Sequence, residues 1–152
     1  AQAQAQFTEL MGSAPARLRW LSALRDQLAD ELTRHPRIAV VGDFNIAPED
    51  RDVHDHEAWS GQILCSDAER ERLGSLLGLG DVDVFRQFPQ PEKTFSWWDY
   101  RAAAFRRNVG LRIDLILASP VLAASCSATG IDSRPRGLEQ PSDHAPVWAI
   151  FI

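Results

Sequence analysis

The spacing of apolar residues predicts a helix and then a strand in the first third of the chain. Between residues 15 and 34, leucines recur every three or four positions, the period of an amphipathic helix, and Ser13 and Pro15 suit its start. After Pro36, residues 38–41 form a short, β-branched apolar run bounded by Gly42. Such a run is typical of a strand buried on both faces.

Further helices and strands alternate along the rest of the chain. Ser66 and Glu69 have the spacing of a helix capping box, and the leucines after them predict a helix that ends at Gly78 and Gly80. Four segments have the composition of strands, of which the last two are expected to be buried: residues 82–84, 94–100, 113–117 and 147–152. Residues 43–61 are polar and irregular, which indicates a long surface loop. The pattern predicts one α/β domain without repeats or linkers.

Length and composition fit a globular protein. The chain has 152 residues, 45% hydrophobic and 24% charged, and Cys65 and Cys126 lack the spacing of a zinc site or disulfide framework. No apolar run approaches the ~20 residues that span a bilayer, and no signal peptide precedes the helix, so we expect a cytoplasmic protein with no membrane partner. Residues 1–12 begin with alternating alanine and glutamine and are expected to be low-complexity or disordered, with the domain covering residues 13–152.

Charge is distributed unevenly. The formal net charge of −5 argues against a protein that coats nucleic acid by charge alone. Four arginines nevertheless follow one another with no acidic residue between them: Arg101, Arg106, Arg107 and Arg112. This cationic island is either a contact for a nucleic acid or a solvated loop.

A carboxylate and an amide follow the first predicted strand. Asp43 and Asn45 are two positions apart, so in an extended segment their side chains project together while Phe44 points back into the packing. This pair can accept a proton from water or ligate a metal, and the amide can donate to a phosphate oxygen. An Asx turn that ends the strand is the common alternative.

Asp114 lies inside an apolar predicted strand, where an unpaired carboxylate is costly. Its partner is either Arg112, in a structural ion pair, or His144, which is the better candidate. A pair of Asp114 and His144 would fix the imidazole tautomer and raise its basicity. Asp143 and His144 are adjacent at a strand entry and are expected to point to opposite sides, so that one holds a metal and the other takes a proton. A solvated surface dipeptide is the alternative.

These motifs occur in an order that resembles the endonuclease/exonuclease/phosphatase superfamily. The segments between them resemble its exodeoxyribonuclease III branch from about residue 38 to the end. The segments that carry this resemblance are residues 79–86, 95–101, 108–114, 130–132 and 139–148. The resemblance implies a DNase I-like four-layer α/β/β/α sandwich, of which this chain is the C-terminal half, with a mixed or mainly antiparallel sheet, flanking helices and an unusually apolar second sheet face.

The resemblance also assigns catalytic roles. Asp43 would orient or deprotonate the attacking water, and Asn45 would contact the scissile phosphate. Asp143 would belong to a Mg²⁺ site, with Mn²⁺ as the alternative ion, and His144 would bind the phosphate while paired with Asp114. The family's metal-binding glutamate has no match in residues 1–37, so the resemblance implies a partial domain.

The resemblance further assigns residues to substrate binding. Trp97, Leu111 and Ile113 match positions that line a pocket for a flipped-out abasic sugar, with core packing as the alternative and equally weighted for Ile113. Arg101 and Asn108 are further substrate-binding candidates. Four other aromatic residues are assigned to the core: Trp20, Trp98, Tyr100 and Trp148.

The predicted function is therefore that of a Mg²⁺-dependent DNA phosphodiesterase of base-excision repair. Its expected substrates are double-stranded DNA with abasic sites or 3′ ends. Two alternatives stay open, namely a related phosphoesterase that acts on a lipid or small phosphoester, and a non-catalytic remnant that binds DNA or a partner chain through the exposed sheet face. The acidic and histidine residues at 54–57 have the composition of a zinc site but lack further ligands, so we interpret them as a solvated loop.

Overall fold

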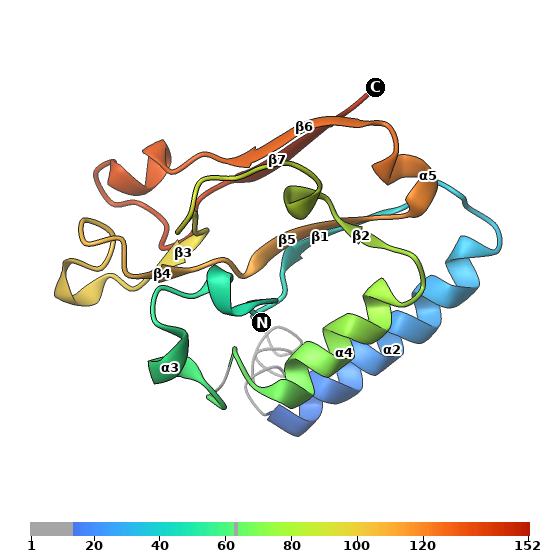
Figure 1. Cartoon of the computed structure of the whole chain (residues 1–152), viewed down its shortest axis with the longest axis horizontal. Helices are drawn as coiled ribbons and strands as arrows, with labels where there is room; N and C mark the ends of the chain where they lie inside the picture. The colour runs from blue at the N-terminus through green and yellow to red at the C-terminus, as the bar shows by residue number, and fades with distance from the viewer. Residues whose placement is uncertain (1–13, 63) are drawn as a thin grey trace.

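Two helices cover one face of a small antiparallel sheet in the computed structural model, which describes residues 14–62 and 64–152 (Figure 1). The predicted low-complexity segment 1–12 and the helix-start residue Ser13 lie outside the described residues. The α-helices are α2 (Ala14–Leu32), α3 (His56–Trp59), α4 (Asp67–Leu77) and α5 (Pro120–Ala123). The strands are β1 (Ala39–Asp43), β2 (Val82–Asp83), β3 (Trp97–Trp98), β4 (Gly110–Leu111), β5 (Asp114–Ala118), β6 (Cys126–Ile131) and β7 (Val147–Phe151).

Short 3₁₀ turns occupy parts of the loops between these elements. They are η1 (Asp50–Asp52), η2 (Val84–Gln87), η3 (Arg101–Ala103) and η4 (Arg134–Gly137). The polar stretch expected as one long loop after β1 therefore contains η1 and α3. No helix among the described residues is long and apolar enough to cross a bilayer.

The predicted capping box of α4 is confirmed. The Ser66 hydroxyl accepts a hydrogen bond from the Glu69 backbone N–H at 3.2 Å, and the Glu69 carboxylate accepts one from the Ser66 backbone N–H at 3.2 Å. These two bonds satisfy N–H groups that a helix start otherwise leaves without partners. The Glu69 side chain also forms an ion pair with Arg17 of α2, so the cap joins the two helices.

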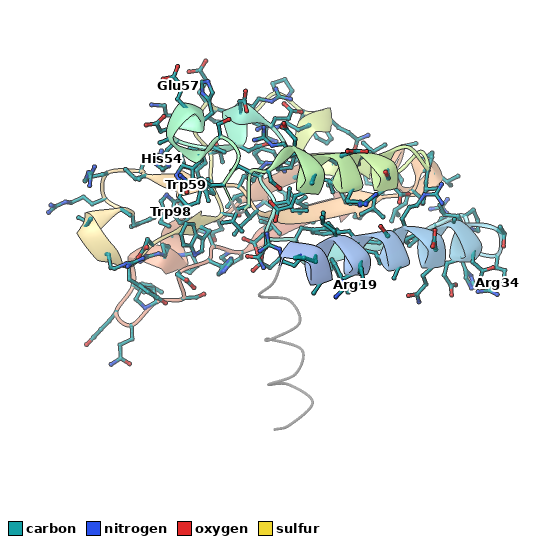
Figure 2. All side chains as sticks on the ribbon, turned by 90° about the horizontal axis from the view of Figure 1, so that it is seen from below. Arg19, Arg34, His54, Glu57, Trp59 and Trp98 are labelled. Carbon is teal, nitrogen blue, oxygen red and sulfur yellow. The ribbon has the colours of Figure 1, made fainter. Side chains whose placement is uncertain are left out.

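The central sheet has the order β1–β5–β2, and both strand pairs are antiparallel. Its helix-facing side packs on α2 and α4 through one apolar cluster, whose buried members are Leu21, Leu28, Phe44, Ile46, Leu73, Leu76, Leu115 and Leu117. Arg19 of α2 points away from the sheet (Figure 2). The leucine periodicity therefore predicted the correct face of this helix.

A separate antiparallel pair, β6–β7, lies on the side of the central sheet away from the helices (Figure 1). Ala149 and Phe151 of β7 pack with the cluster around Val84 and Ala118. The small pair β3–β4 lies at one end of the molecule, where it carries Trp97 opposite Leu111. The arrangement is a mainly antiparallel α/β fold with flanking helices, as the sequence predicted.

Four predictions about burial are wrong. Strand β7, which was expected to be buried, has no fully buried residue, because its positions alternate between half-buried and exposed. Strand β1 is not buried on both faces, because four of its five residues are exposed, with Val41 at 64%. Tyr100 and Trp148 are not core residues, since they are 59% and 42% exposed. Trp98 is buried as predicted, and Trp20 packs against the helix–sheet cluster.

Candidate active site

The register of β1 and β5 brings two candidate carboxylates together. Asp43, the last residue of β1, lies directly opposite Asp114, the first residue of β5. Directly opposed residues of an antiparallel pair have their side chains on the same face of the sheet. The end of this strand pair therefore presents two carboxylates to one point.

The turn after β1 places Asn45 beside Asp43. The backbone N–H of Asn45 donates to Asp43 Oδ1 at 2.8 Å, and Asn45 adopts a left-handed backbone with φ 52°. Phe44 between them is 5% exposed, and its N–H donates to the carbonyl of Ile113 at 3.0 Å. The Asx-type turn that was the alternative is therefore present. Because Asn45 has a left-handed rather than an extended backbone, the joint projection of the Asp43 and Asn45 side chains stays a prediction.

Asp114 is paired with His144. The Nδ1 atom of His144 lies 2.8 Å from Asp114 Oδ2, and the two side chains are 31% and 13% exposed. Arg112, the alternative partner, instead bonds to Asp52 and Asp83. The hydrogen bond to Asp114, aided by the charges of nearby carboxylates, raises the pKa of His144 against the opposing effect of burial.

The other ring nitrogen of His144 faces two more carboxylates. Its Nε2 atom is 3.7 Å from Asp43 Oδ2 and 3.9 Å from Asp143 Oδ1. The expectation that Asp143 and His144 point to opposite sides is therefore wrong. Residues 142–146 are irregular rather than part of a strand, so the alternation of side chains along a strand does not apply to them.

The cluster has the donors that a hard divalent cation requires. One ligand atom from each of Asp43, Asp114 and His144 lies within 4.8 Å of the others, and the Asp143 carboxylate lies beside them. Partial burial raises the pKa of Asp43, as do the charges of Asp114 and Asp143, against the lowering effects of the Asn45 N–H and His144. Facing carboxylates that repel one another, with oxygen atoms as donors, fit Mg²⁺ or Mn²⁺.

Ser96 is a further residue of this site that the sequence interpretation missed. Its side chain is fully buried, and its Oγ accepts the backbone N–H groups of both Ile113 and Asp114 at 3.0 and 3.1 Å. Its carbonyl accepts the N–H of Ala145 at 2.7 Å. One residue thus fixes the backbone on either side of the Asp114–His144 pair. A small polar residue within the aromatic segment 94–100 was the available signal.

The predicted substrate-binding residues differ in exposure. Trp97 is half-buried, whereas Leu111 and Ile113 are enclosed at 0% and 2% exposure in a cluster with Val53 and Cys65. Core packing therefore describes Leu111 and Ile113 in this structure. The role of these three residues as walls of a sugar pocket stays a prediction.

Two other substrate-binding candidates already have partners within the chain. The guanidinium of Arg101 bonds to the Asp99 carboxylate at 2.6 and 3.0 Å, and these bonds lower the pKa of Asp99 to about 2. The Asn108 side chain accepts from the Trp98 indole N–H and donates to the Lys93 carbonyl, both at 3.0 Å. Both residues hold local structure, and their contact with DNA stays a prediction.

The cationic island is divided between surface and interior. Arg112 is 1% exposed and bonds to Asp52 at 2.7 Å and Asp83 at 2.6 Å, with its guanidinium 4.6 Å from the centre of the Phe85 ring. Burial lowers the pKa of Arg112, but the hydrogen bonds that it donates to the two carboxylates, together with their charges, outweigh that effect and raise it. Arg101, Arg106 and Arg107 remain on the surface.

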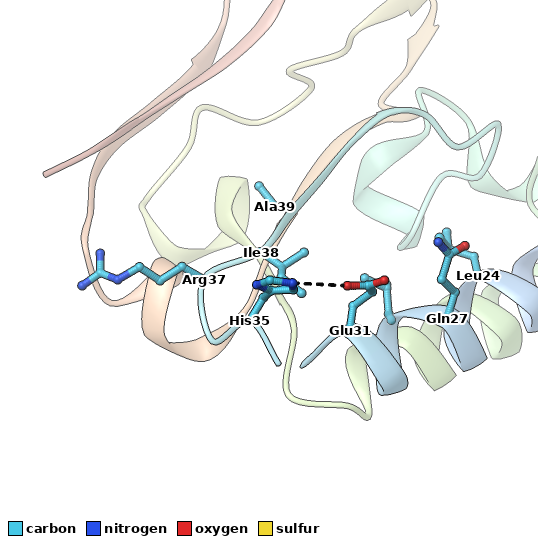
Figure 3. Close-up of a pocket in the computed structure, with 8 residues that line it drawn as sticks. Leu24, Gln27, Glu31, His35, Arg37, Ile38 and Ala39 are labelled. Atoms are coloured by element: carbon cyan, nitrogen blue, oxygen red, sulfur yellow. Dashed lines mark ion pairs between the residues drawn. The ribbon is translucent and has the colours of Figure 1, made fainter. Parts of the chain in front are cut away.

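Two other groups of ionisable residues lie outside the cluster. Residues 54–57 were interpreted as a solvated loop, but His56 and Glu57 instead begin α3. His54 Nδ1 lies 3.2 Å from the Gly110 carbonyl and Asp55 caps α3, while Glu57 points outward (Figure 2). A cavity of about 450 Å³ lies between the end of α2 and the start of β1 (Figure 3). Among its lining residues, Glu31 Oε2 and His35 Nε2 lie 3.8 Å apart, and Asp43, Asp114 and His144 do not line it. We place the candidate active site at Asp43, Asp114 and His144 instead, because their side chains converge on one point.

Comparison with known proteins identifies the family of this chain. Residues 10–144 match the model of the endonuclease/exonuclease/phosphatase family. The chain is 39% identical over 144 residues to exodeoxyribonuclease III of Haemophilus influenzae, an alignment that covers 90% of this chain and 54% of that protein. The chain thus spans about half the length of the exodeoxyribonucleases it matches.

Solved structures of other proteins also match this chain over about half of their own length. A 3′ phosphatase from Neisseria bound to a product DNA hairpin has a TM-score of 0.86 and 46% identity, with 88% of this chain and 52% of that chain covered. An AP endonuclease from Archaeoglobus fulgidus has a TM-score of 0.81 and 37% identity, with the same coverage. These similarities confirm the predicted fold class.

Proposed function

Because the chain belongs to the endonuclease/exonuclease/phosphatase family, we propose that it forms part of a Mg²⁺-dependent DNA phosphodiesterase of base-excision repair. Its substrates would be double-stranded DNA with abasic sites or 3′ ends. The proposal is supported by relatives that include an exodeoxyribonuclease III, a 3′ phosphatase bound to a DNA hairpin and an AP endonuclease. The predicted cytoplasmic location belongs to the same proposal, because a repair enzyme must reach chromosomal DNA.

The observation that carries the proposal is the Asp114–His144 pair facing Asp43 and Asp143. A carboxylate on Nδ1 leaves Nε2 directed into the cluster, 3.7 Å from Asp43. With its raised pKa, His144 carries a proton more readily, so its Nε2–H can donate to a phosphate oxygen and stabilise developing negative charge. The side-chain amide of Asn45, whose backbone N–H donates to Asp43, would donate to the same phosphate group.

Asp43 would act on the attacking water. Its pKa is raised by partial burial and by neighbouring carboxylates, which makes it a stronger base than an exposed aspartate once it is ionised. Asp143, with Asp43 near it, would hold the metal ion. A bound Mg²⁺ would polarise the phosphate and neutralise charge there.

The rest of the catalytic site would come from outside these residues. Magnesium is usually held by one or two carboxylates together with substrate and water. The chain spans about half the length of its exodeoxyribonuclease relatives. We therefore propose that a segment equivalent to the other half supplies further metal and phosphate ligands, and that this chain corresponds to a truncated form of the family domain.

The test is cleavage of a duplex with one abasic site and of a duplex with a 3′ phosphate, with and without Mg²⁺. The protein should be one that joins this chain to the remaining half of the family domain, with Asp143→Asn as the inactive reference. We expect Mg²⁺-dependent cleavage that the reference lacks. Hydrolysis of a lipid or small phosphoester without cleavage of DNA would favour the related phosphoesterase, and DNA binding without any hydrolysis would favour the non-catalytic remnant.

A further inference from the structure

The indole of Trp97 is hydrogen-bonded to the predicted metal ligand. Its Nε1–H donates to Asp143 Oδ2 at 3.0 Å. The other oxygen of the same carboxylate, Oδ1, lies 3.9 Å from His144 Nε2. The bond to the indole therefore occupies the outer oxygen and leaves the inner one directed at the cluster.

The backbone around Asp143 is held by the same segment. The Trp98 N–H donates to the Asp143 carbonyl at 3.1 Å, and the Ala145 N–H donates to the Ser96 carbonyl at 2.7 Å. Trp97 and His144 form an isolated antiparallel bridge between these two bonds. The segment 96–98 thus fixes both the main chain of residues 143–145 and the side chain of Asp143.

We propose that Trp97 is a positioning residue for the Asp143 carboxylate and thereby sets the affinity of the cluster for a divalent cation. This inference rests on the proposed function, in which Asp143 holds the metal. It gives the Trp97 side chain a role that depends on its N–H group and not on its aromatic surface. A wall for an apolar sugar would need only the ring.

The surroundings of Asp143 explain why a fixed orientation is needed. Its side chain is 37% exposed and follows an irregular stretch, so the local backbone does not restrict it to one rotamer. An ion-binding carboxylate that is free to rotate loses side-chain entropy when the ion binds. A hydrogen-bond donor on the oxygen that faces away from the ion removes part of that cost, and loss of such partners typically weakens metal binding about 10- to 100-fold.

The matched substitutions are Trp97→Phe and Trp98→Phe. Each removes one indole N–H that forms a 3.0 Å hydrogen bond and retains an aromatic ring. Trp98→Phe leaves the side-chain oxygen of Asn108 without this donor, and Asn108 is not part of the cluster. The same change in side-chain volume and hydrogen bonding is thus made at two neighbouring positions, of which only Trp97 has a side chain bonded to the Asp143 carboxylate.

The experiment measures Mg²⁺ binding to the full 152-residue chain without DNA, by titration followed in ¹⁵N-resolved NMR spectra. We expect Trp97→Phe to move the binding midpoint to about 10-fold higher Mg²⁺ or more, and Trp98→Phe to leave it at the wild-type value. Equal midpoints in the wild type and Trp97→Phe would overturn the inference while leaving the proposed function intact. A wild-type chain whose spectrum does not respond to Mg²⁺ would also overturn the inference, because the cluster would then not hold the ion without ligands from the other half of the family domain; the proposed function, which includes those ligands, would stand.

A second measurement follows the indole signals of the wild type. In the wild type, the indole N–H signal of Trp97 should shift when Mg²⁺ is added, because its acceptor is the carboxylate that binds the ion, whereas the signal of Trp98 should not. Asp143→Asn should abolish the shift. An indole signal of Trp97 that stays fixed while other cluster signals move would show that the indole bond does not report on the metal, and the inference would be wrong.

Discussion

The Nδ1 atom of His144 lies 2.8 Å from Asp114 Oδ2, while its Nε2 atom faces Asp43 at 3.7 Å. The two ring nitrogens therefore have different roles. A carboxylate at Nδ1 favours the tautomer and the charged form in which that nitrogen is protonated, and it fixes the plane of the ring. Nε2 is left as the nitrogen that can exchange a proton with a phosphate oxygen or water.

Replacing Asp114 by Asn should lower the pKa of His144 toward its ordinary value of 6.5. The carboxylate stabilises the charged ring by a hydrogen bond and by its charge, and an amide supplies no such charge. An NMR titration of the imidazole signals checks this, with Asp132→Asn as a control that removes a carboxylate bonded to Arg134. A pKa that is the same in Asp114→Asn and in the wild type would contradict the pairing.

The same pair should also make stability depend on pH. Because the folded pKa of His144 is raised, the pair stabilises the native state fully below the unfolded value of about 6.5 and loses this effect as pH rises through the folded pKa. The difference in unfolding free energy between wild type and Asp114→Asn should therefore shrink as pH increases across this range. Urea unfolding at a series of pH values measures this difference. A difference that grows with pH would contradict a raised pKa of His144 in the folded state.

Asp43→Asn, Asp143→Asn and His144→Asn should each remove most phosphodiesterase activity in a protein that contains the complete family domain. Each side chain supplies charge or a proton at the reacting phosphate, where loss of one such group typically costs about 10²–10³ in rate. Activity is measured at saturating Mg²⁺, and urea unfolding shows that the fold is kept. Near-normal turnover in any one variant would exclude that residue from the catalytic site.

Arg112→Met should strongly destabilise the fold. The substitution leaves the Asp52 carboxylate, which is fully buried, without one of its two arginine partners. Breaking a buried ion pair in this way costs about 3–5 kcal/mol. Arg134→Met breaks an exposed pair with Asp132 and should leave the free energy of unfolding nearly unchanged. Urea unfolding compares the two, and similar small losses in both would mean that the buried network adds little stability.

Local sequence signals predicted much of this structure. The capping box of α4, the helix-facing leucines of α2 and the Asp114–His144 pair are each determined by chemistry that a short segment reveals. A carboxylate inside an apolar strand needs a partner, so Asp114 pointed to His144 before any distance was known. The resemblance to a known family, which rests on the order of the motifs along the chain, indicated that they belong to one site.

Other features depend on contacts between distant segments. Strand β6 was not predicted, because its sequence is rich in small residues and its strand character comes from pairing with β7. Arg112 was assigned to a surface island, although Asp52 and Asp83 hold it in the interior from distant positions in the sequence. The exposure of Trp148 depends on what covers β7, which its own sequence does not specify.

The 152-residue chain alone should show no appreciable nuclease activity. The described cluster contributes Asp143 and its neighbours to the metal, and we have proposed that further ligands come from outside the chain. The measurement compares this chain with the complete family domain at equal concentration on an abasic duplex with Mg²⁺. A rate for the chain that is comparable to that of the complete domain would contradict the proposed division of the site.

The outer face of β7 should make this chain self-associate. Exposed and half-buried positions alternate along β7, with Ala149 and Phe151 packed inward and Trp148 and Ile150 exposed at 42% and 52%. A strand that is apolar on both faces is typical of a buried environment, and an exposed apolar patch on a sheet is a common site of association. Light scattering should therefore give a solution mass above that of a monomer.

Substitution identifies the surface responsible. Trp148→Ser combined with Ile150→Ser should return the mass to that of a monomer, because both side chains leave the outer face without changing the inward residues of β7. Leu138→Ser is the control, since Leu138 is 67% exposed but follows the turn η4 and lies outside the strands. If the control lowered the mass as much as the double variant, general surface hydrophobicity would explain association. A wild-type chain that is monomeric at the same concentration would contradict the prediction, since the exposed β7 face would then be tolerated in water without a partner.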